Sequence, residues 1–458
     1  MNVYLETLGC RLNYSEMESL GRQLVQAGHC VVAAPEQADV CVLNTCAVTG
    51  EAGRKSRQLA RRLARSNPAA RLAVTGCYAT LAPNAVADLP NVGLVVENRR
   101  KEGLAELLQP WSAELDGEQW RRLAADAPLH QPGRTRAFVK VQDGCNNHCT
   151  FCIVTVARGP ERSRPVDEIV AEVQRLAAEE VQEAVLTGVH LGGYGSDLGL
   201  DEPRPFAGDS VQRELRARPA QGDNVSLYAL VAAILEQTDL PRLRLSSLEP
   251  WDIEPSFFDL WRQSAGRLCP HLHLPLQAGC DKTLKRMARR TRTADFRSLL
   301  DEARARIPGL MVSTDIIVGF PGESAADFEA SLRFIEEMAF AHVHVFPYSA
   351  REGTAAAGFS GQVAVEERRR RVDAVEAVAR RTGEAVRRSF LGDVRPVLWE
   401  TLERPANGAG PLWSGLTDNY LRVQAIAPAG LDLENRITPA RLVAIDGQAL
   451  RAEVRSDA

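Results

Sequence analysis

The chain has 458 residues, of which 45% are hydrophobic and 25% charged, and its net charge at neutral pH is −4. This length and composition predict about three globular domains and exclude disordered, collagen-like and coiled-coil proteins. No run approaches the roughly 20 apolar residues that span a bilayer, and the first ten residues lack a signal-peptide pattern. We therefore expect a cytoplasmic protein with no membrane partner, whose ten cysteines serve metal binding or catalysis rather than disulfides.

Residues 1–112 alternate short strands with helices, which is typical of an open parallel-sheet α/β domain. Strands are expected at 3–8, 40–44, 72–75 and 92–97, and helices at 15–27 and 53–65. Residues 113–136 combine proline, glycine and mixed charge without periodicity, which indicates a linker.

The alternation resumes at residue 137 and predicts a TIM-like, partial barrel over 137–360. Its strands are expected at 137–142, 183–186, 242–245, 271–274, 312–318 and 341–346, with helices at 167–180, 227–237, 294–306 and 326–338. Residues 196–224 interrupt this pattern and are interpreted as an insertion.

A charged connecting helix is expected over 361–390. After it, the sequence pattern changes to short runs that are typical of β-strands. These runs cover 394–400, 415–426 and 436–446. Their length and glycine-rich spacing favour a small β-barrel over 391–450.

Three cysteines within eight residues, Cys145, Cys149 and Cys152, form a C-x3-C-x2-C motif directly after the first predicted barrel strand. Thiolates are the preferred ligands of iron–sulfur clusters, and three of them would leave one iron of a four-iron cluster open. The alternative is a structural zinc site with His148 as fourth ligand, although zinc ligands usually come as two separated pairs.

A second trio is dispersed along the chain: Cys10, Cys46 and Cys77 each lie just beyond a predicted N-terminal strand. Because the carboxyl ends of parallel strands meet at one edge of a sheet, we expect a second three-thiolate site there. The other cysteines lack this placement and are interpreted as structural: Cys30, Cys41, Cys269 and Cys280.

The motif around Cys145, with Phe151 before its last cysteine, resembles the radical S-adenosylmethionine (SAM) signature. With the dispersed trio and the terminal β-rich region, the chain resembles the radical-SAM methylthiotransferases nearly end to end. The motifs most similar to the branch that acts on threonylcarbamoyladenosine at tRNA position 37 are TLGCRLN, NTCAVT, RKSRQ, QDGCNN and LTGVH.

The resemblance implies an N-terminal methylthiotransferase domain, a radical-SAM barrel and a TRAM domain that binds RNA or substrate. It implies two [4Fe–4S] clusters and two SAM molecules, one cleaved to the radical that takes hydrogen from adenine C2 and one that methylates a sulfur held on the second cluster. The implied partners are the tRNA anticodon loop and a flavodoxin- or ferredoxin-like electron donor; no residue indicates the sulfur source.

Further residues resemble the family's SAM contacts at the ends of barrel strands. They are Thr187, Gly188 and His190, then Ser246, Ser247 and Glu249, and finally Gly319.

Two acid-free basic runs, 53–65 and 282–292, are candidates for tRNA phosphate contacts, with a solvated helix face as the alternative. The chosen candidates are Arg54, Lys55, Arg57, Arg61, Lys285 and Arg289. Trp413, Asn419 and Tyr420 are candidates for contacts with unpaired bases.

Two histidine pairs, His271 with His273 and His342 with His344, alternate along predicted strands. We interpret them as packing or substrate-positioning residues rather than metal ligands. Three other functions stay open: methylthiolation of isopentenyl-adenosine, methylthiolation of a ribosomal-protein side chain, and a zinc-bearing, non-enzymatic RNA-binding protein.

Overall fold

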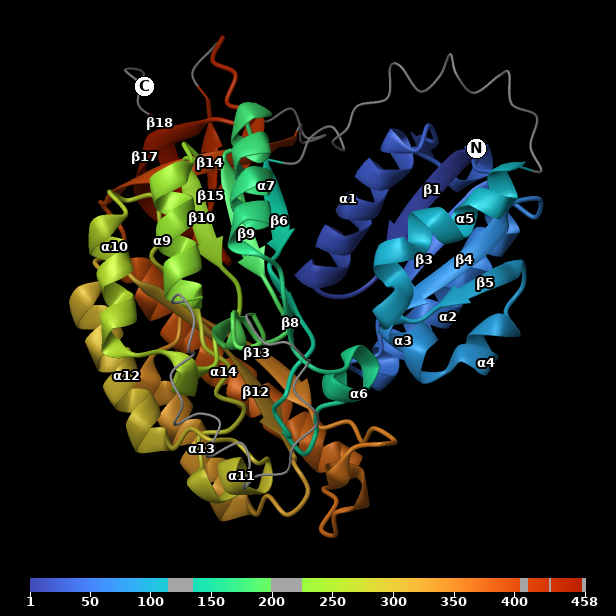
Figure 1. Ribbon diagram of the computed structural model, residues 1–458. Helices are drawn as coiled ribbons and strands as arrows, with labels where there is room; N and C mark the ends of the chain where they lie inside the picture. Colours follow the sequence, from blue (N-terminus) through green and yellow to red (C-terminus); the bar gives the residue numbers. More distant parts are fainter. Residues whose placement is uncertain (114–134, 199–224, 404–410, 428–429, 455–458) are drawn as a thin grey trace.

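The computed structural model describes residues 1–113, 135–198, 225–403, 411–427 and 430–454. The predicted linker 113–136 and insertion 196–224 lie almost entirely outside these residues. A parallel-sheet domain, a partial barrel and a small β-barrel follow one another along the chain, as predicted (Figure 1). None of the described helices is both long and apolar enough to cross a membrane.

The N-terminal domain is a five-stranded parallel sheet in the order β2-β1-β3-β4-β5. Its strands are β1 (Asn2–Thr7), β2 (Cys30–Val32), β3 (Val40–Thr45), β4 (Arg71–Gly76) and β5 (Val92–Val96). Strand β2 was not predicted, because three residues at a sheet edge carry no readable pattern.

Helices cover both faces of this sheet. One face packs against α1 (Arg11–Gln26) and α5 (Leu104–Ala113), and the other against α2 (Gly50–Ser66), α3 (Cys77–Leu81) and α4 (Pro83–Ala87). The loops at the carboxyl ends of β1, β3 and β4 therefore share one edge of the domain.

The central barrel is partial, with six parallel strands in two hydrogen-bonded groups, β10-β9-β6 and β11-β12-β13. Isolated bridges from Leu243 to Leu268 and from Ser247 to His273 join the two groups. The strands are β6 (Arg136–Lys140), β9 (Glu183–Thr187), β10 (Arg242–Leu245), β11 (His271–His273), β12 (Met311–Val318) and β13 (His342–Pro347).

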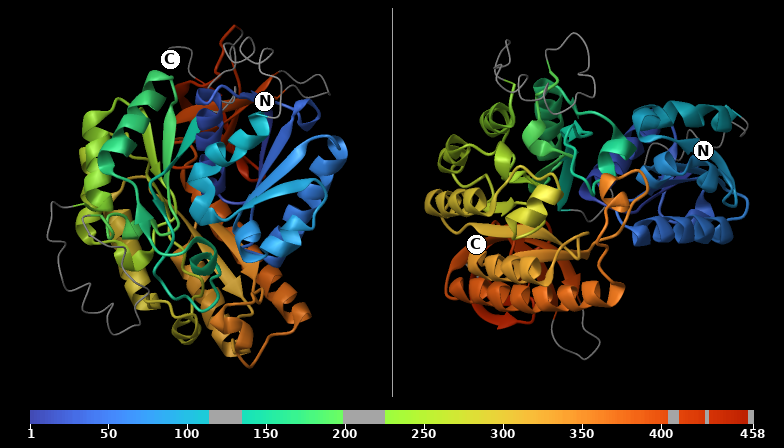
Figure 2. Two further views of the ribbon diagram at one scale, coloured as in Figure 1. Left: turned by 45° about the vertical axis from the view of Figure 1, so that its right-hand side comes forward. Right: turned by 90° about the horizontal axis from the view of Figure 1, so that it is seen from below.

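The main helices of this barrel lie outside the strands, and the N-terminal domain lies beside the barrel, as both views of Figure 2 show. The outer helices include α7 (Val166–Ala178), α9 (Leu227–Gln237), α12 (Thr293–Arg306) and α13 (Ala325–Met338). Helix α1 of the N-terminal domain packs against β6, at one side of the gap in the barrel.

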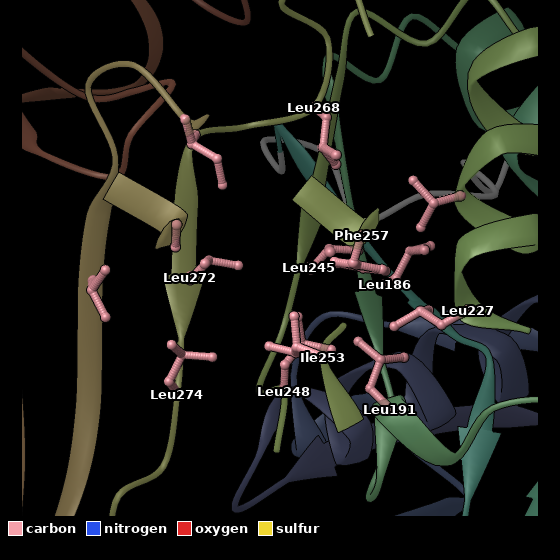
Figure 3. Packing of buried hydrophobic residues seen from close by; sticks show 14 of the residues in the cluster. Leu186, Leu191, Leu227, Leu245, Leu248, Ile253, Phe257, Leu268, Leu272 and Leu274 are labelled. Carbon is pink, nitrogen blue, oxygen red and sulfur yellow. The ribbon is translucent and has the colours of Figure 1, made fainter. Parts of the chain in front are cut away.

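The main core lies between the strands and the outer helices. Leu272 and Leu274 are fully buried there, together with leucines from β9, β10 and α9 (Figure 3). Because side chains alternate along a strand, His271 and His273 face the interior of the barrel instead.

Helix α14 (Val365–Ser389) leads into a closed five-stranded barrel in the order β14-β15-β16-β18-β17. Its strands are β14 (Val394–Glu403), β15 (Leu412–Thr417), β16 (Arg422–Ile426), β17 (Ile437–Asp446) and β18 (Ala449–Val454). The run 415–426, predicted as one element, is two strands, because the chain turns at Tyr420, whose φ is +76°. Strand β18 was not predicted.

Buried charges join the small barrel to the amino ends of the central strands. Glu183 and Arg244, both fully buried, form two hydrogen bonds of 2.7 and 2.8 Å. Arg242 donates to the backbone oxygens of Pro396 and Leu416, and Arg136 donates to Glu400 at 2.7 Å. The small barrel therefore covers this end of the central barrel.

We expect Glu183→Ala to lower the free energy of unfolding by about 3–5 kcal/mol, because it leaves a buried guanidinium without its carboxylate. Urea unfolding monitored by circular dichroism measures this loss. The matched control is Glu337→Ala, whose exposed carboxylate binds Arg297 at 2.8 Å and whose loss should leave the midpoint unchanged. Equal midpoints for both variants would contradict the prediction.

Candidate active site

The dispersed cysteines meet at the carboxyl edge of the N-terminal sheet. Cys10 follows β1, Cys46 follows β3, and Cys77 begins α3 directly after β4. A side chain at Gly9 would place its Cβ 2.9 Å from Cβ of Cys46, and one at Gly76 would lie 2.3 Å from the oxygen of Thr45. Both glycines have positive φ, so close approach and backbone conformation require glycine at these positions.

The thiols of this trio interact electrostatically. Burial raises the pKa of Cys46, and the nearby Cys10 and Cys77 thiols raise it further. Cys46 and Cys77 are buried, whereas Cys10 is exposed. Deprotonated thiols this close together are stabilised when a positive centre balances their charge, as a bound metal does. The donor set therefore fits a metal cluster.

A single zinc ion would require its three sulfur ligands to lie close together. A zinc–sulfur distance of about 2.3 Å would place neighbouring sulfurs about 3.8 Å apart. Among the described residues, no group of metal-binding atoms that all lie within 4.8 Å of one another contains a whole cysteine trio, although Cys145 forms such a group with Glu161 and His190.

The contiguous trio lies on the loop between β7 (Gln142–Asp143) and α6 (Val154–Arg158). The loop is held at both ends, because Cys145 donates its backbone N–H to Gly159 and Cys152 donates to Cys149, each at 3.0 Å. Burial and the neighbouring Cys149 raise the pKa of the Cys152 thiol to about 11. Like the thiols of the dispersed trio, these thiols fit a positively charged cluster.

Arg289 lies against this trio and not on the surface. Its side chain is 1% exposed, forms two hydrogen bonds of 2.9 and 2.6 Å with Glu249, and lies 3.9 Å from Sγ of Cys149. Burial raises the pKa of Cys149, and the Arg289 guanidinium opposes this rise. The predicted phosphate contact of Arg289 is therefore not supported, because its charge is already buried and paired.

The predicted SAM contacts occupy the ends of the barrel strands next to this trio. Ser246 has a buried hydroxyl with no hydrogen-bond partner among the described residues, which a bound ligand would satisfy. Ser247 binds His273 at 2.6 Å, and Glu249 is engaged by Arg289. Gly319, with φ +69°, donates its N–H to Glu323 at 2.6 Å. Their roles as SAM contacts stay predictions.

His190 is held by two carboxylates. Its ring binds Glu161 at 2.6 Å and Asp252 at 2.5 Å; burial lowers its pKa, but these bonds outweigh burial and raise it to about 10. Its N–H donates to the side chain of Gln142, which a Cβ at Gly188 would approach to 3.1 Å. Thr187 accepts a backbone bond from Val141. This segment therefore fixes the end of β9 against the loop that precedes Cys145.

Arg158 connects the two cysteine sites. It is 2% exposed and ends α6, just after the contiguous trio. It donates to Glu16 at 2.8 Å, to Asn13 at 2.8 Å and to Asp143 at 2.9 Å. Glu16 and Asn13 lie on α1, which begins directly after Cys10. One guanidinium thus bridges the N-terminal domain and the barrel.

The hydrogen-bond network around Arg158 extends to Cys77 of the dispersed trio. Lys101 binds Glu16 at 2.6 Å, and Asn98 lies 3.6 Å from Sγ of Cys77 while donating to the oxygen of Ala157. Burial would raise the pKa of Glu16, but Lys101 and Arg158 hold it well below its usual range. The network therefore stays ionised inside the protein.

Sequence reasoning missed the residues of this network, because a buried charge has no signature of its own in a single sequence. It also missed Arg351, in the loop after β13, which donates to the backbone oxygen of Val48 and whose charge interacts with Cys46. The signal that could have identified Arg351 is its position as a basic residue shortly after the end of a predicted barrel strand.

The predicted RNA contacts fall into two groups. Arg54, Lys55, Arg61 and Lys285 are exposed, although the first two lie near Glu51. Arg57 is half-buried and donates to the hydroxyl of Tyr78 at 2.8 Å.

Three C-terminal candidates do not present a surface to RNA. Trp413 and Asn419 are buried, and Tyr420 accepts a hydrogen bond from Arg11 at 2.8 Å beneath the central barrel. Base stacking on these residues is not supported, because other parts of the chain cover them.

Comparison with known proteins agrees with this geometry. Residues 2–97 match Uncharacterized protein family UPF0004, and residues 139–335 match the Radical SAM superfamily. The chain is 33% identical to the threonylcarbamoyladenosine tRNA methylthiotransferase MtaB of Bacillus subtilis over 92% of this chain and 89% of that protein. It is 32% identical to the tRNA-2-methylthio-N(6)-dimethylallyladenosine synthase of Dictyoglomus thermophilum over 98% of each chain.

Among solved structures, the radical SAM methyltransferase TsrM of Kitasatospora setae shares the fold, with a TM-score of 0.53 at 14% identity over 78% of this chain and 77% of that chain. The barrel and its cysteine loop define a radical-SAM enzyme, which uses SAM with a [4Fe–4S] cluster. The chain belongs to the family of radical-SAM tRNA methylthiotransferases.

We expect Arg158→Met to lower the free energy of unfolding by about 3–5 kcal/mol, because Glu16 and Asp143 would lose their shared cation. Limited proteolysis should cut between the two domains sooner in this variant than in the wild type. The matched control is Arg62→Met, which removes an exposed guanidinium 3.2 Å from Glu6 and should change neither measurement. An unchanged unfolding midpoint in Arg158→Met would contradict the bridging role.

Proposed function

We propose that this enzyme methylthiolates C2 of N6-threonylcarbamoyladenosine at tRNA position 37, with a second [4Fe–4S] cluster on Cys10, Cys46 and Cys77. The observation that carries the proposal is the pair of three-thiol sites near Arg158, whose guanidinium binds Glu16 and Asp143 and interacts electrostatically with Cys77. The relatives from Bacillus subtilis and Thermotoga maritima, each 33% identical, are named for this nucleoside.

When bound, the clusters and SAM supply a radical able to break an aromatic C–H bond and a sulfur that can be methylated and transferred. Cys145, Cys149 and Cys152 hold the cluster that binds SAM, and Arg289 favours the deprotonated form of Cys149. At the second site, Arg158 and Lys101 interact electrostatically with Cys77 and balance part of the negative charge of the thiolates.

The tRNA partner is supported by the exposed basic face of α2. This helix begins four residues after Cys46, and Arg54 and Lys55 lie in its first two turns, whereas Arg61 lies further along it. Phosphate contacts of this kind dominate RNA affinity and weaken with salt. An anticodon-loop base can be splayed into the barrel without breaking a duplex, and a flavodoxin- or ferredoxin-like protein supplies the electron.

Of the three alternatives, the first keeps the family and changes the nucleoside, whereas the other two conflict with the family to which the chain belongs. Dimethylallyladenosine is the substrate named for the relative from Dictyoglomus thermophilum, and its 32% identity is close to that of the other branch. A ribosomal-protein side chain would gain the methylthio group without any change in tRNA. A zinc-bearing RNA-binding protein would contain stoichiometric zinc and almost no iron.

Two cysteine variants should separate the two sites. Cys149→Ala should abolish SAM cleavage, because it removes a ligand of the SAM-binding cluster. Cys46→Ala should retain measurable SAM cleavage and lose methylthio transfer. Anaerobic assays of 5′-deoxyadenosine and of methylthiolated RNA measure the two steps.

The control for these variants is Cys280→Ala, a half-buried cysteine outside both trios, which should retain both steps. Equal loss of SAM cleavage in Cys149→Ala and Cys46→Ala would contradict separate roles.

The substrate is tested by nucleoside mass spectrometry of tRNA from cells with and without this gene. We expect the methylthio form of threonylcarbamoyladenosine to disappear while its precursor accumulates. Loss of methylthio-dimethylallyladenosine instead, or unchanged tRNA, would refute the proposed substrate. Iron, sulfide and zinc analysis of the anaerobically purified protein tests the zinc alternative.

A further inference from the structure

The interior face of the barrel carries a cluster of imidazoles on three adjacent strands. The parallel register places His273 of β11 beside Ser313, and His342 and His344 of β13 beside Ser313 and Asp315 of β12. The rings of His342 and His344 lie 4.3 Å apart, and those of His273 and His344 lie 5.8 Å apart. Imidazole groups in a barrel interior need hydrogen-bond partners.

Part of the cluster satisfies itself. His273 binds Ser247 at 2.6 Å through one ring nitrogen and Asp315 at 3.1 Å through the other. His342 and His344, in contrast, are exposed on the interior face, so side chains do not fill this part of the barrel. Partial desolvation and neighbouring histidine and arginine side chains lower the pKa of His342 and, to about 4, that of His344, although Asp315 opposes both shifts. Both rings are therefore neutral hydrogen-bonding groups at neutral pH.

Arg11 reaches the same interior from the N-terminal domain. Its guanidinium donates to the hydroxyl of Tyr420 at 2.8 Å, and its charge lowers the pKa of both His271 and His344. No ion pair with a carboxylate joins Arg11 to any described residue. The guanidiniums beneath it are paired, Arg136 with Glu400 and Arg244 with Glu183.

Residues next to each cysteine site connect this cluster to both sites. Arg11 directly follows Cys10 of the dispersed trio. Ser247, which binds His273, precedes by two residues the Glu249 that pairs with Arg289 next to Cys149. A base presented to both sites would therefore place its substituents near Arg11 and His344.

We infer that Arg11 and His344 bind the carboxylate of the substrate's N6 substituent and so select an anionic nucleoside over an apolar one. This inference rests on the proposed function and assigns its specificity to named residues. An unpaired guanidinium and a neutral N–H donor suit a carboxylate, with which arginine forms strong charge-assisted bonds. A dimethylallyl group offers neither donor an acceptor, and a site built to bind a polar group discriminates against an analogue that lacks it.

Asp315 is the negative group in this cluster and interacts with His273, His342 and His344. His273 binds its carboxylate at 3.1 Å, and among the described residues no ion pair joins Asp315 to Arg11. The pairing leaves the Arg11 guanidinium for the substrate.

The test compares anticodon stem-loop RNAs that differ only at position 37: threonylcarbamoyladenosine, its methyl ester, and dimethylallyladenosine. The wild-type enzyme should prefer the acid to the neutral ester in KM and in binding affinity, on the order of tenfold to a hundredfold. Arg11→Gln should abolish most of this preference by weakening binding of the acid alone, and His344→Phe should reduce it. The change in the acid-to-ester ratio isolates the contact between the guanidinium and the carboxylate.

Two controls exclude indirect effects. Tyr420→Phe removes the hydrogen bond of Arg11 but keeps the charge, and should retain the preference; Arg297→Gln changes a surface guanidinium on α12 and should change nothing. Iron content of Arg11→Gln should equal that of the wild type, which shows that the cysteine site beside Arg11 is intact.

An acid-to-ester ratio in Arg11→Gln equal to that of the wild type would overturn the inference while leaving the proposed function intact. A wild-type enzyme that does not modify the threonylcarbamoyl stem-loop would instead refute the proposed function itself.

Discussion

The buried guanidinium of Arg158 is the interaction on which the arrangement of this enzyme depends. It binds groups from both domains at once, Glu16 and Asn13 on one side and Asp143 on the other. A charge taken out of water is stable only when its partners are complete, so the two domains dock in the orientation that completes them. That orientation brings the dispersed cysteines, which the chain separates by up to 67 positions, to the side of the barrel that carries the contiguous ones.

The barrel divides its chemistry between the two faces of its strands. Outward-facing leucines build a dry core against the helices (Figure 3), whereas inward-facing residues are arginine, glutamate, histidine and aspartate. In most barrels the interior is packed with branched apolar side chains. Here the inward-facing charges near the small barrel are paired with one another, whereas the polar side chains at the other end of the strands are available to a substrate. Residues that stabilise the fold and residues that we propose bind the substrate therefore lie at opposite ends of the same strands.

Much of the fold was readable from the sequence because strand–helix alternation is a local signal. The cysteine positions were equally readable, since a residue just after a parallel strand has only one edge of the sheet to occupy. The failures have a common cause: they concern residues whose partners are distant in sequence. Arg289 looked like a surface cation within a basic run, but Glu249, forty residues away, neutralises it. Tyr420 looked like a base-stacking residue, but Arg11, over four hundred residues away, contacts it. Strand β2 was missed because it is a three-residue strand at a sheet edge, and β18, which pairs with both β16 and β17, was missed although it completes the closed barrel.

The hydrogen bonds of Arg242 to the backbone of the C-terminal barrel make that barrel part of the structure of the central barrel. Backbone carbonyls of Pro396 and Leu416 accept hydrogen bonds from a buried guanidinium whose nearest carboxylate, that of Glu183, is 3.9 Å away and is shared with Arg244. The C-terminal barrel therefore closes the amino end of the central barrel. Replacing either barrel would also require changing the residues at the interface between them.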